Sequence, residues 1–207
     1  MAVPDDSVIP DSTPNLLHLL LLAQLFGHSV SHPVHHLHLC TNFGSMIRQL
    51  NVVQQQSKKL HDSSGTDLSG ITTETYSLEG LPSMEHNASQ INSVKLNESL
   101  SQLYLDIQAF KLHVDWLKTV RENFSLPHSQ TVEGASTHLL LLSNLTSGAL
   151  HKISETVPEP PSPSLPRVSS SFSALRYSLE VSQRLQVFCL WSKRVLLHLK
   201  GLRGCHS

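Results

Sequence analysis

The chain has 207 residues, which is enough for one domain with its own hydrophobic core. Apolar residues make up 39% of it and aromatic residues only 5%, which favours leucine-rich helices over strands. The 15 basic and 16 acidic residues nearly balance, so the charge gives no support to binding of nucleic acid or of an anionic membrane.

An apolar run, Leu16–Phe26, lies near the start of the chain. It is shorter than the about 20 residues that a membrane-spanning helix needs. The small residues Ser29-Val30-Ser31 that follow it are typical of a cleavage site, although the acidic residues before it replace the basic start that is usual. We predict a signal peptide over residues 1–31, then a secreted, extracellular domain over 32–207 that does not insert into a membrane. A buried N-terminal helix is the alternative.

The first amphipathic helix is expected over residues 39–60, where apolar residues recur at helical spacing. A long connection rich in Ser, Thr and Gly follows, over residues 61–92. It contains one apolar segment, Leu78–Met84, which we expect to pack on the helices.

The second helix, residues 93–121, has the clearest pattern in the chain. Its apolar residues are spaced alternately four and three positions apart, which is the heptad pattern of a buried seam. These residues are Leu96, Leu100, Leu103, Ile107, Phe110, Val114 and Leu117. We interpret them as packing residues and expect no cofactor site there.

A short connection with Pro127 leads to the third helix, residues 131–153. Five prolines within residues 157–166 exclude a helix and predict an extended proline-rich strap. The fourth helix, residues 172–202, follows Ser169-Ser170-Ser171, whose hydroxyl groups can cap it.

The lengths of the connections predict the topology. A helix of about 20–29 residues is roughly 30–43 Å long. A chain that returns to the same end therefore needs at least about ten extended residues, at about 3.3 Å each. The first and third connections are long enough and the second is short. The sequence thus predicts an all-α, long-chain four-helix bundle with up-up-down-down order and two long crossovers.

Two stretches of the chain resemble the interleukin-11 family. In Leu78–Val120, the segment Leu78–Met84 and the ending His113–Leu117 are similar to the family's L-x-x-L-P and H-V-x-W-L patterns. In Ser169–Lys200, WSKRVLLHLK is similar to the family's W-x-x-R-x-L-L-x-L-K. Three features differ from the family: the chain has Asn-x-Ser/Thr glycosylation sequons, it has cysteines, and it has Phe172 where the family has tryptophan. They mark a divergent member, which we attribute to a non-mammalian vertebrate.

The resemblance implies a secreted cytokine that binds a specific alpha receptor. It then assembles the signalling receptor shared by the interleukin-6 family, which activates kinases in the cell (JAK-STAT signalling). The residues that the resemblance assigns to the alpha receptor are Arg194, Trp191, Leu81, Pro82 and Met84. Phe172 and Arg176 are assigned to the shared receptor. A surface on the first and third helices is expected to contact another copy of that receptor, without assigned residues.

The residues themselves leave other roles open for these positions. Arg176, Val187 and Arg194 share one outer face of the fourth helix, because their spacings are near multiples of 3.6. A solvated basic face is the alternative for the two arginines, and a helix-boundary residue is the alternative for Trp191.

Other classes of protein fit less well. The chain lacks G-x-S-x-G, H-E-x-x-H, P-loop and G-x-G-x-x-G motifs, so we expect no enzyme and no cofactor. The histidines of residues 32–38 are not expected to bind a metal. A leukaemia-inhibitory-factor relative usually carries several disulfides, which three cysteines cannot supply. An apolipoprotein-like lipid-binding protein is the other alternative, although the second and third helices carry few bases. We expect the free protein to be a monomer.

Four Asn-x-Ser/Thr sequons support export. Asn97 and Asn144 fall within predicted helices. We therefore expect glycosylation at the other two, Asn87 and Asn123.

The cysteines are expected to form one bridge. Cys40 begins the first helix and Cys205 follows the fourth, so the topology puts both at one end of the bundle. A secreted chain passes through an oxidising compartment, and we expect a Cys40–Cys205 disulfide. Free thiols and a covalent dimer remain open. Cys189, roughly 15 Å along the helix, is expected to be a buried thiol.

Overall fold

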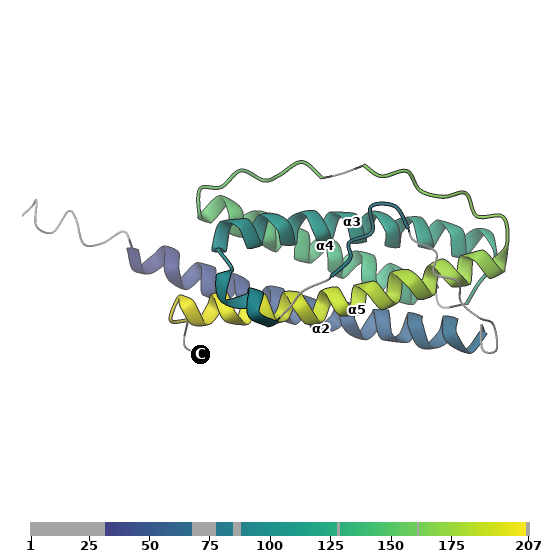
Figure 1. Cartoon of the computed structure of the whole chain (residues 1–207), viewed down its shortest axis with the longest axis horizontal. Helices are drawn as coiled ribbons and strands as arrows, with labels where there is room; N and C mark the ends of the chain where they lie inside the picture. The colour runs from purple at the N-terminus through teal and green to yellow at the C-terminus, as the bar shows by residue number, and fades with distance from the viewer. Residues whose placement is uncertain (1–31, 68–77, 85–87, 128, 161, 206–207) are drawn as a thin grey trace, which may run out of the picture. The chain divides into compact units, whose positions relative to one another are not determined.

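The computed structural model describes residues 32–67, 78–84, 88–127, 129–160 and 162–205 (Figure 1). The chain divides into two units, residues 1–37 and 38–207, and the packing described below belongs to the second. The predicted signal peptide, residues 1–31, and the sequon residue Asn87 lie outside the described residues.

Four α-helices and one short 3-10 helix make up the described elements. They are α2 (His32–Asp67), η1 (Ala88–Ser93), α3 (Leu96–Asn123), α4 (Ser129–Lys152) and α5 (Ser171–Leu202). No strand occurs among the described residues, and the helices pack on one another, so the predicted all-α class is confirmed.

The main difference from the predicted bounds is in α2, which extends seven residues beyond the predicted 39–60 at each end. Its apolar pattern stops at Leu60, but the buried face continues with the small Ser64. Val53, Ser57, Leu60 and Ser64 are all buried and are spaced four, three and four apart. Serine was not counted as a core residue in the sequence, and the helix was therefore predicted to end too early.

Polar contacts show that α3 and α4 run antiparallel. Gln108 Nε2 donates to Ser143 Oγ at 2.6 Å, and Lys118 Nζ donates to Glu133 Oε1 at 3.1 Å. A later residue of α3 thus meets an earlier residue of α4. These two helices form one layer of the bundle, and α2 and α5 form the other (Figure 1).

The contacts between α2 and α4 and between α3 and α5 are antiparallel as well. Asn42 of α2 accepts from Lys152 Nζ of α4 at 3.2 Å, whereas Gln49 further along α2 lies 2.7 Å from the earlier His138. At the far end of α3, Arg121 contacts Ser178 near the start of α5. Thus α2 and α3 run one way and α4 and α5 the other. This confirms the up-up-down-down order, and Figure 1 shows the strap running from the end of α4 to the start of α5.

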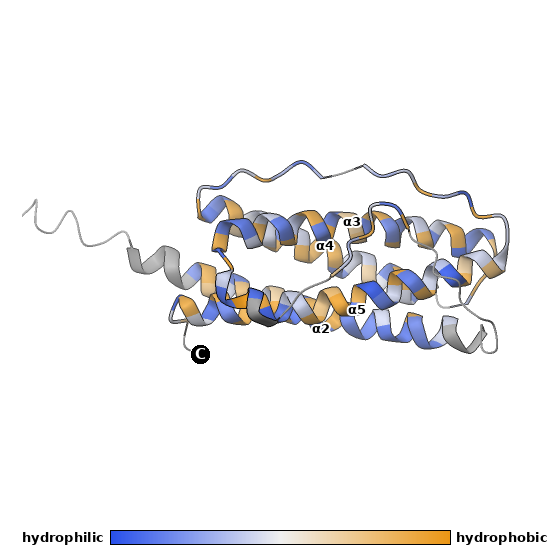
Figure 2. Cartoon of the chain, viewed as in Figure 1, coloured by the Kyte–Doolittle hydropathy of each residue, from blue (hydrophilic) through white to orange (hydrophobic). Residues whose placement is uncertain are grey.

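The core lies between the two layers. Hydrophobic and hydrophilic residues alternate along each helix, as amphipathic helices require (Figure 2). Phe110 of α3 and Phe188 of α5 meet with ring centroids 4.9 Å apart, and neither is exposed. Burying one such side chain contributes about 1.5–3 kcal/mol. All seven residues of the predicted α3 seam belong to this core or pack against it.

One buried cation was not predicted. Arg121, near the end of α3, is 1% exposed. Its guanidinium donates to Ser178 Oγ at 2.9 Å and to the carbonyl oxygen of Pro127. The side chain therefore fixes the short connection between α3 and α4 against the start of α5.

A disulfide joins α2 to the segment that follows α5. Cys40 of α2 and Cys205, after α5, are bonded with their Cα atoms 5.6 Å apart, which is the pairing expected from the topology. Cys189 is a free thiol in the core, and burial raises its pKa to about 12. Among the described residues, no helix is both long and apolar enough to cross a membrane.

Candidate binding surfaces on α5

The outer face of α5 carries the exposed residues of the candidate sites. Ser170 Oγ accepts from the backbone N–H of Ser173 at 3.2 Å and thus caps the helix at its N-terminus. The residues opposite the core then form one row along the helix. Its members are Phe172, Arg176, Val187, Leu190, Arg194 and Leu197, all exposed except the half-buried Arg176.

An aromatic residue and a cation meet at the N-terminal end of this row. The Phe172 side chain is 38% exposed, and the Arg176 guanidinium carbon lies 5.7 Å from its ring centroid. A cation at this distance is attracted to the ring face, by about 0.5–1 kcal/mol at an exposed site. Arg176 therefore orients Phe172 without covering it.

The C-terminal end of the row is more apolar than the sequence suggested. Arg194 is exposed, and the exposed Leu190 and Leu197 lie four residues before it and three after it. Both leucines were missed because α5 is rich in leucine here and the buried Leu196 and Leu199 are close in sequence. Their spacing of seven, in phase with Arg194, was the available signal.

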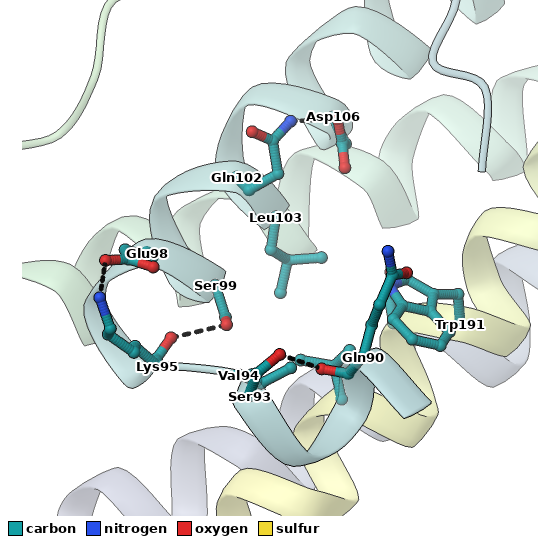
Figure 3. A pocket seen from close by; sticks show the side chains of 12 residues that line it. Gln90, Ser93, Val94, Lys95, Glu98, Ser99, Gln102, Leu103, Asp106 and Trp191 are labelled. Atoms are coloured by element: carbon teal, nitrogen blue, oxygen red, sulfur yellow. Dashed lines mark hydrogen bonds and ion pairs between the residues drawn. The ribbon is translucent and has the colours of Figure 1, made fainter. Parts of the chain in front are cut away.

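A pocket of about 420 Å³ lies between α5, α3 and η1 (Figure 3). The half-buried Trp191 forms one wall with Gln90, and the ion pair of Lys95 and Glu98, at 2.7 Å, stands at the other side. The hydrogen bond from Lys95 to Glu98 raises the pKa of this lysine. Trp191 is thus a boundary residue whose indole lines a surface pocket.

The crossover segment, residues 78–84, is held by two residues of α5. Glu180 Oε1 accepts from the backbone N–H of Leu78 at 3.2 Å, and Arg184 donates to the carbonyl oxygen of Leu81 at 3.0 Å. Glu180 and Arg184 also pair with each other at 2.9 Å. Neither residue was singled out in the sequence, because each acts on a segment about 100 residues away.

A histidine of α3 holds the same segment from another side. His113 is buried, and its Nε2 lies 3.1 Å from the carbonyl oxygen of Glu79. Its Nδ1 lies 2.7 Å from the carbonyl oxygen of Ala109, one turn earlier in α3. The H-V-x-W-L ending of the helix therefore positions the first crossover.

The crossover residues that were assigned to the alpha receptor differ in how deeply they are buried. Leu81 is 5% exposed and packs in the core, so we withdraw it as a direct contact and keep it as internal support. Pro82 and Met84 are half-buried and remain candidates. A second pocket, lined by Leu81 and Pro82, shares Gln102 and Asp106 with the Trp191 pocket. The crossover segment and Trp191 therefore lie on one face of the bundle.

The two crossovers touch at a glycine. Gly80 has φ of +72°, and a Cβ on it would lie 2.5 Å from the Cβ of Pro163 in the strap. Next to it, Ser164 Oγ donates to Glu79 Oε2 at 2.7 Å. Only glycine fits both this backbone conformation and this approach.

We expect Gly80→Ala to lower the free energy of unfolding by about 1–3 kcal/mol, because alanine is strained at this φ and displaces Pro163. Gly148→Ala is the control, since no atom lies within 4 Å of a Cβ there and φ is ordinary for a helix. The control is expected to gain roughly 0.5–1 kcal/mol. Denaturant titration of both variants measures the difference, and equal stability would contradict the role of Gly80.

Other expected sites are placed as follows. Asn123, the last residue of α3, is exposed. Within the part of the chain that the structure describes, no group of three or more His, Cys, Asp or Glu side chains could hold a metal ion.

Comparison with known families gives a match over most of the chain. The family model described as Interleukin 11 matches residues 33–203, which include most of α2 and all of α3, α4 and α5. No curated protein matches the chain.

Proposed function

We propose that this chain, which belongs to the interleukin-11 family, is a secreted cytokine that acts by bringing receptor chains together. Members of this family are cytokines and not enzymes, and a cytokine receptor is the expected partner. The protein supplies binding energy and geometry, and the kinases that respond belong to the cell.

The alpha receptor binds at the C-terminal end of α5 in this proposal. Arg194, with Leu190 and Leu197 beside it, supplies an exposed cation flanked by apolar side chains. Arginine and large apolar residues of this kind carry much of the energy of protein interfaces. Trp191 and Pro82 line the two pockets that share a wall on α3, and Met84, in the same crossover segment as Pro82, extends this surface.

The shared signalling receptor binds at the other end of α5, at Phe172 and Arg176. The separation of the two ends carries the proposal. Phe172 and Arg194 are 22 positions apart, which is about 33 Å along a helix. An interface that buries about 800 Å² on one partner is roughly 32 Å across if it is circular. Two receptor chains can therefore occupy α5 together without overlap.

A reporter assay tests the proposed function. Cells that express the shared receptor are treated with the secreted chain, with and without an interleukin-11-type alpha receptor. We expect a response only when both receptors are present. A response that needs no alpha receptor would favour another helical cytokine of the same superfamily. Sedimentation of the protein with liposomes, without any response, would favour the lipid-binding alternative.

Arg194→Glu is expected to weaken alpha-receptor binding by about 1–3 kcal/mol, or about 5- to 150-fold in Kd, because it reverses an exposed charge within the interface. Arg167→Glu makes the same change at an exposed position of the strap and is the control. Binding to immobilised alpha receptor measures both, after circular dichroism has shown that each variant is folded. An unchanged Kd for Arg194→Glu would retire this assignment.

A further inference from the structure

The outer face of α4 carries an exposed apolar pair. Leu140 is 47% exposed and Leu141 is 43% exposed. Their neighbours Leu139 and Leu142 are both fully buried, so the core does not account for the exposed pair. Asn144, exposed as well, follows the pair by four and three positions. Residues at these spacings are neighbours on a helix surface, so Asn144 lies beside both leucines.

We propose that Asn144 carries an N-linked glycan that covers Leu140 and Leu141 on the outer face of α4. Asn144-Leu145-Thr146 is a complete acceptor sequon. The inference rests on the proposed function, because only a chain that enters the secretory route meets the glycosylation machinery.

The neighbouring helices leave this face of α4 open. On one side, Ser143 accepts from Gln108 of α3 at 2.6 Å. On the other side, His138 lies 2.7 Å from Gln49 of α2. Asn144 lies on the exposed face between these two contacts. A glycan there projects into solvent and displaces no side chain of the bundle.

The helical position of Asn144, which counted against it in the sequence, requires only that the modification precede folding. The sequon threonine, Thr146, is buried in α4, and its Oγ1 donates to the carbonyl oxygen of Leu142 at 2.8 Å. A transferase that must read this hydroxyl therefore acts on the extended chain. The exposed Asn144 side chain keeps the glycan outside when α4 forms.

The transfer uses a lipid-linked oligosaccharide pyrophosphate as donor. A bond forms between Asn144 Nδ2 and the anomeric carbon of the first sugar, and the bond from that carbon to the pyrophosphate oxygen breaks. The lipid pyrophosphate leaves, and the amide nitrogen loses one proton. No oxidant or reductant takes part in this exchange.

The exposed pair fits a sugar better than a protein. A stable interface buries about 800 Å² on each partner, far more than two leucine side chains supply. The sugars nearest to the asparagine lie within reach of residues three and four positions away, and the carbon faces of their rings are apolar. A glycan at this position leaves a partner that contacts both α2 and α4 only the side of α4 that faces α2.

Mass spectrometry of the secreted full chain tests the modification. Cleavage after glutamate gives the peptide of residues 134–155, which contains Asn144 and no other sequon. We expect enzymatic removal of the glycan in heavy-oxygen water to convert Asn144 to labelled Asp in this peptide. Asn144→Gln is expected to lose the mass of one glycan. Secreted protein with unmodified Asn144 would overturn the inference alone, whereas a chain that stays in the cell without glycan would contradict the proposed function as well.

A hydrophobic dye tests whether the glycan covers the leucines. Removal of the glycan from the folded protein is expected to increase dye fluorescence, and Leu140→Ser with Leu141→Ser is expected to abolish that increase. Asn123→Gln is the matched control, because Asn123 is the exposed sequon residue at the end of α3. It is expected to leave the dye fluorescence of the folded protein unchanged. An increase that persists without the two leucines, or no increase at all, would show that the glycan does not cover them.

Discussion

Phe172→Ala is expected to abolish signalling while alpha-receptor binding stays unchanged. The ring is 38% exposed and is oriented by Arg176, so its loss removes an aromatic contact and little core packing. Truncation of such an interface residue costs about 2 kcal/mol or more, which is about 30-fold or more in affinity for the shared receptor. The reporter assay measures the signal, and binding to immobilised alpha receptor measures the first step.

The reporter assay and the alpha-receptor binding assay together distinguish the roles of the two ends of α5. Gln183→Ala is the control, because Gln183 is exposed and lies midway between Phe172 and Arg194, 11 positions from each. It is expected to keep both activities. Arg176→Ala is expected to reduce signalling less than Phe172→Ala, because it removes only the cation that orients the ring. Full reporter activity of Phe172→Ala would contradict the assignment of Phe172 to the shared receptor. A parallel loss of alpha-receptor binding would show that the two surfaces are not separate.

Most of the fold could be predicted from the sequence because its signals are local. The α3 seam is visible in the spacing of seven apolar residues, and the helix directions follow from the lengths of three connections. The exceptions are polar residues inside the core. Ser57 and Ser64 extend the buried face of α2, and Arg121 is buried through hydrogen bonds to Ser178 and Pro127. Residue type alone predicts exposure for all three, and only the packing of the folded bundle reverses it.

The candidate surfaces were predictable to a smaller extent. The exposure of Phe172 and Arg194 follows from helical spacing, since both lie opposite the apolar stripe of α5. The position of Leu81 does not follow, because Leu81 and Pro82 are adjacent in an irregular segment and only one enters the core. Nor could the contacts of Glu180, Arg184 and His113 with that segment be predicted, since hydrogen bonds between distant residues leave no periodic pattern.

The bridge between Cys40 and Cys205 is expected to have the largest effect on stability. It joins residues 165 positions apart, and removing it frees nearly the whole domain in the unfolded state. On the chain-entropy model this loss is about 5 kcal/mol, which is a large part of the stability of an ordinary domain. We therefore expect Cys40→Ser with Cys205→Ser to shift the denaturant midpoint strongly.

The double variant avoids a lone thiol that could form dimers, and Cys189→Ala is the matched control. Cys189 is buried and takes no part in the bridge, so its replacement is expected to cost only about 1 kcal/mol. Thiol titration gives an independent readout. Burial raises the pKa of Cys189 to about 12, so at pH 8 it is protonated and shielded in the native protein. We expect no reactive thiol before unfolding and one after it. Three thiols after unfolding without reductant, or equal stability of the double variant and the wild type, would show that the secreted protein lacks the bridge.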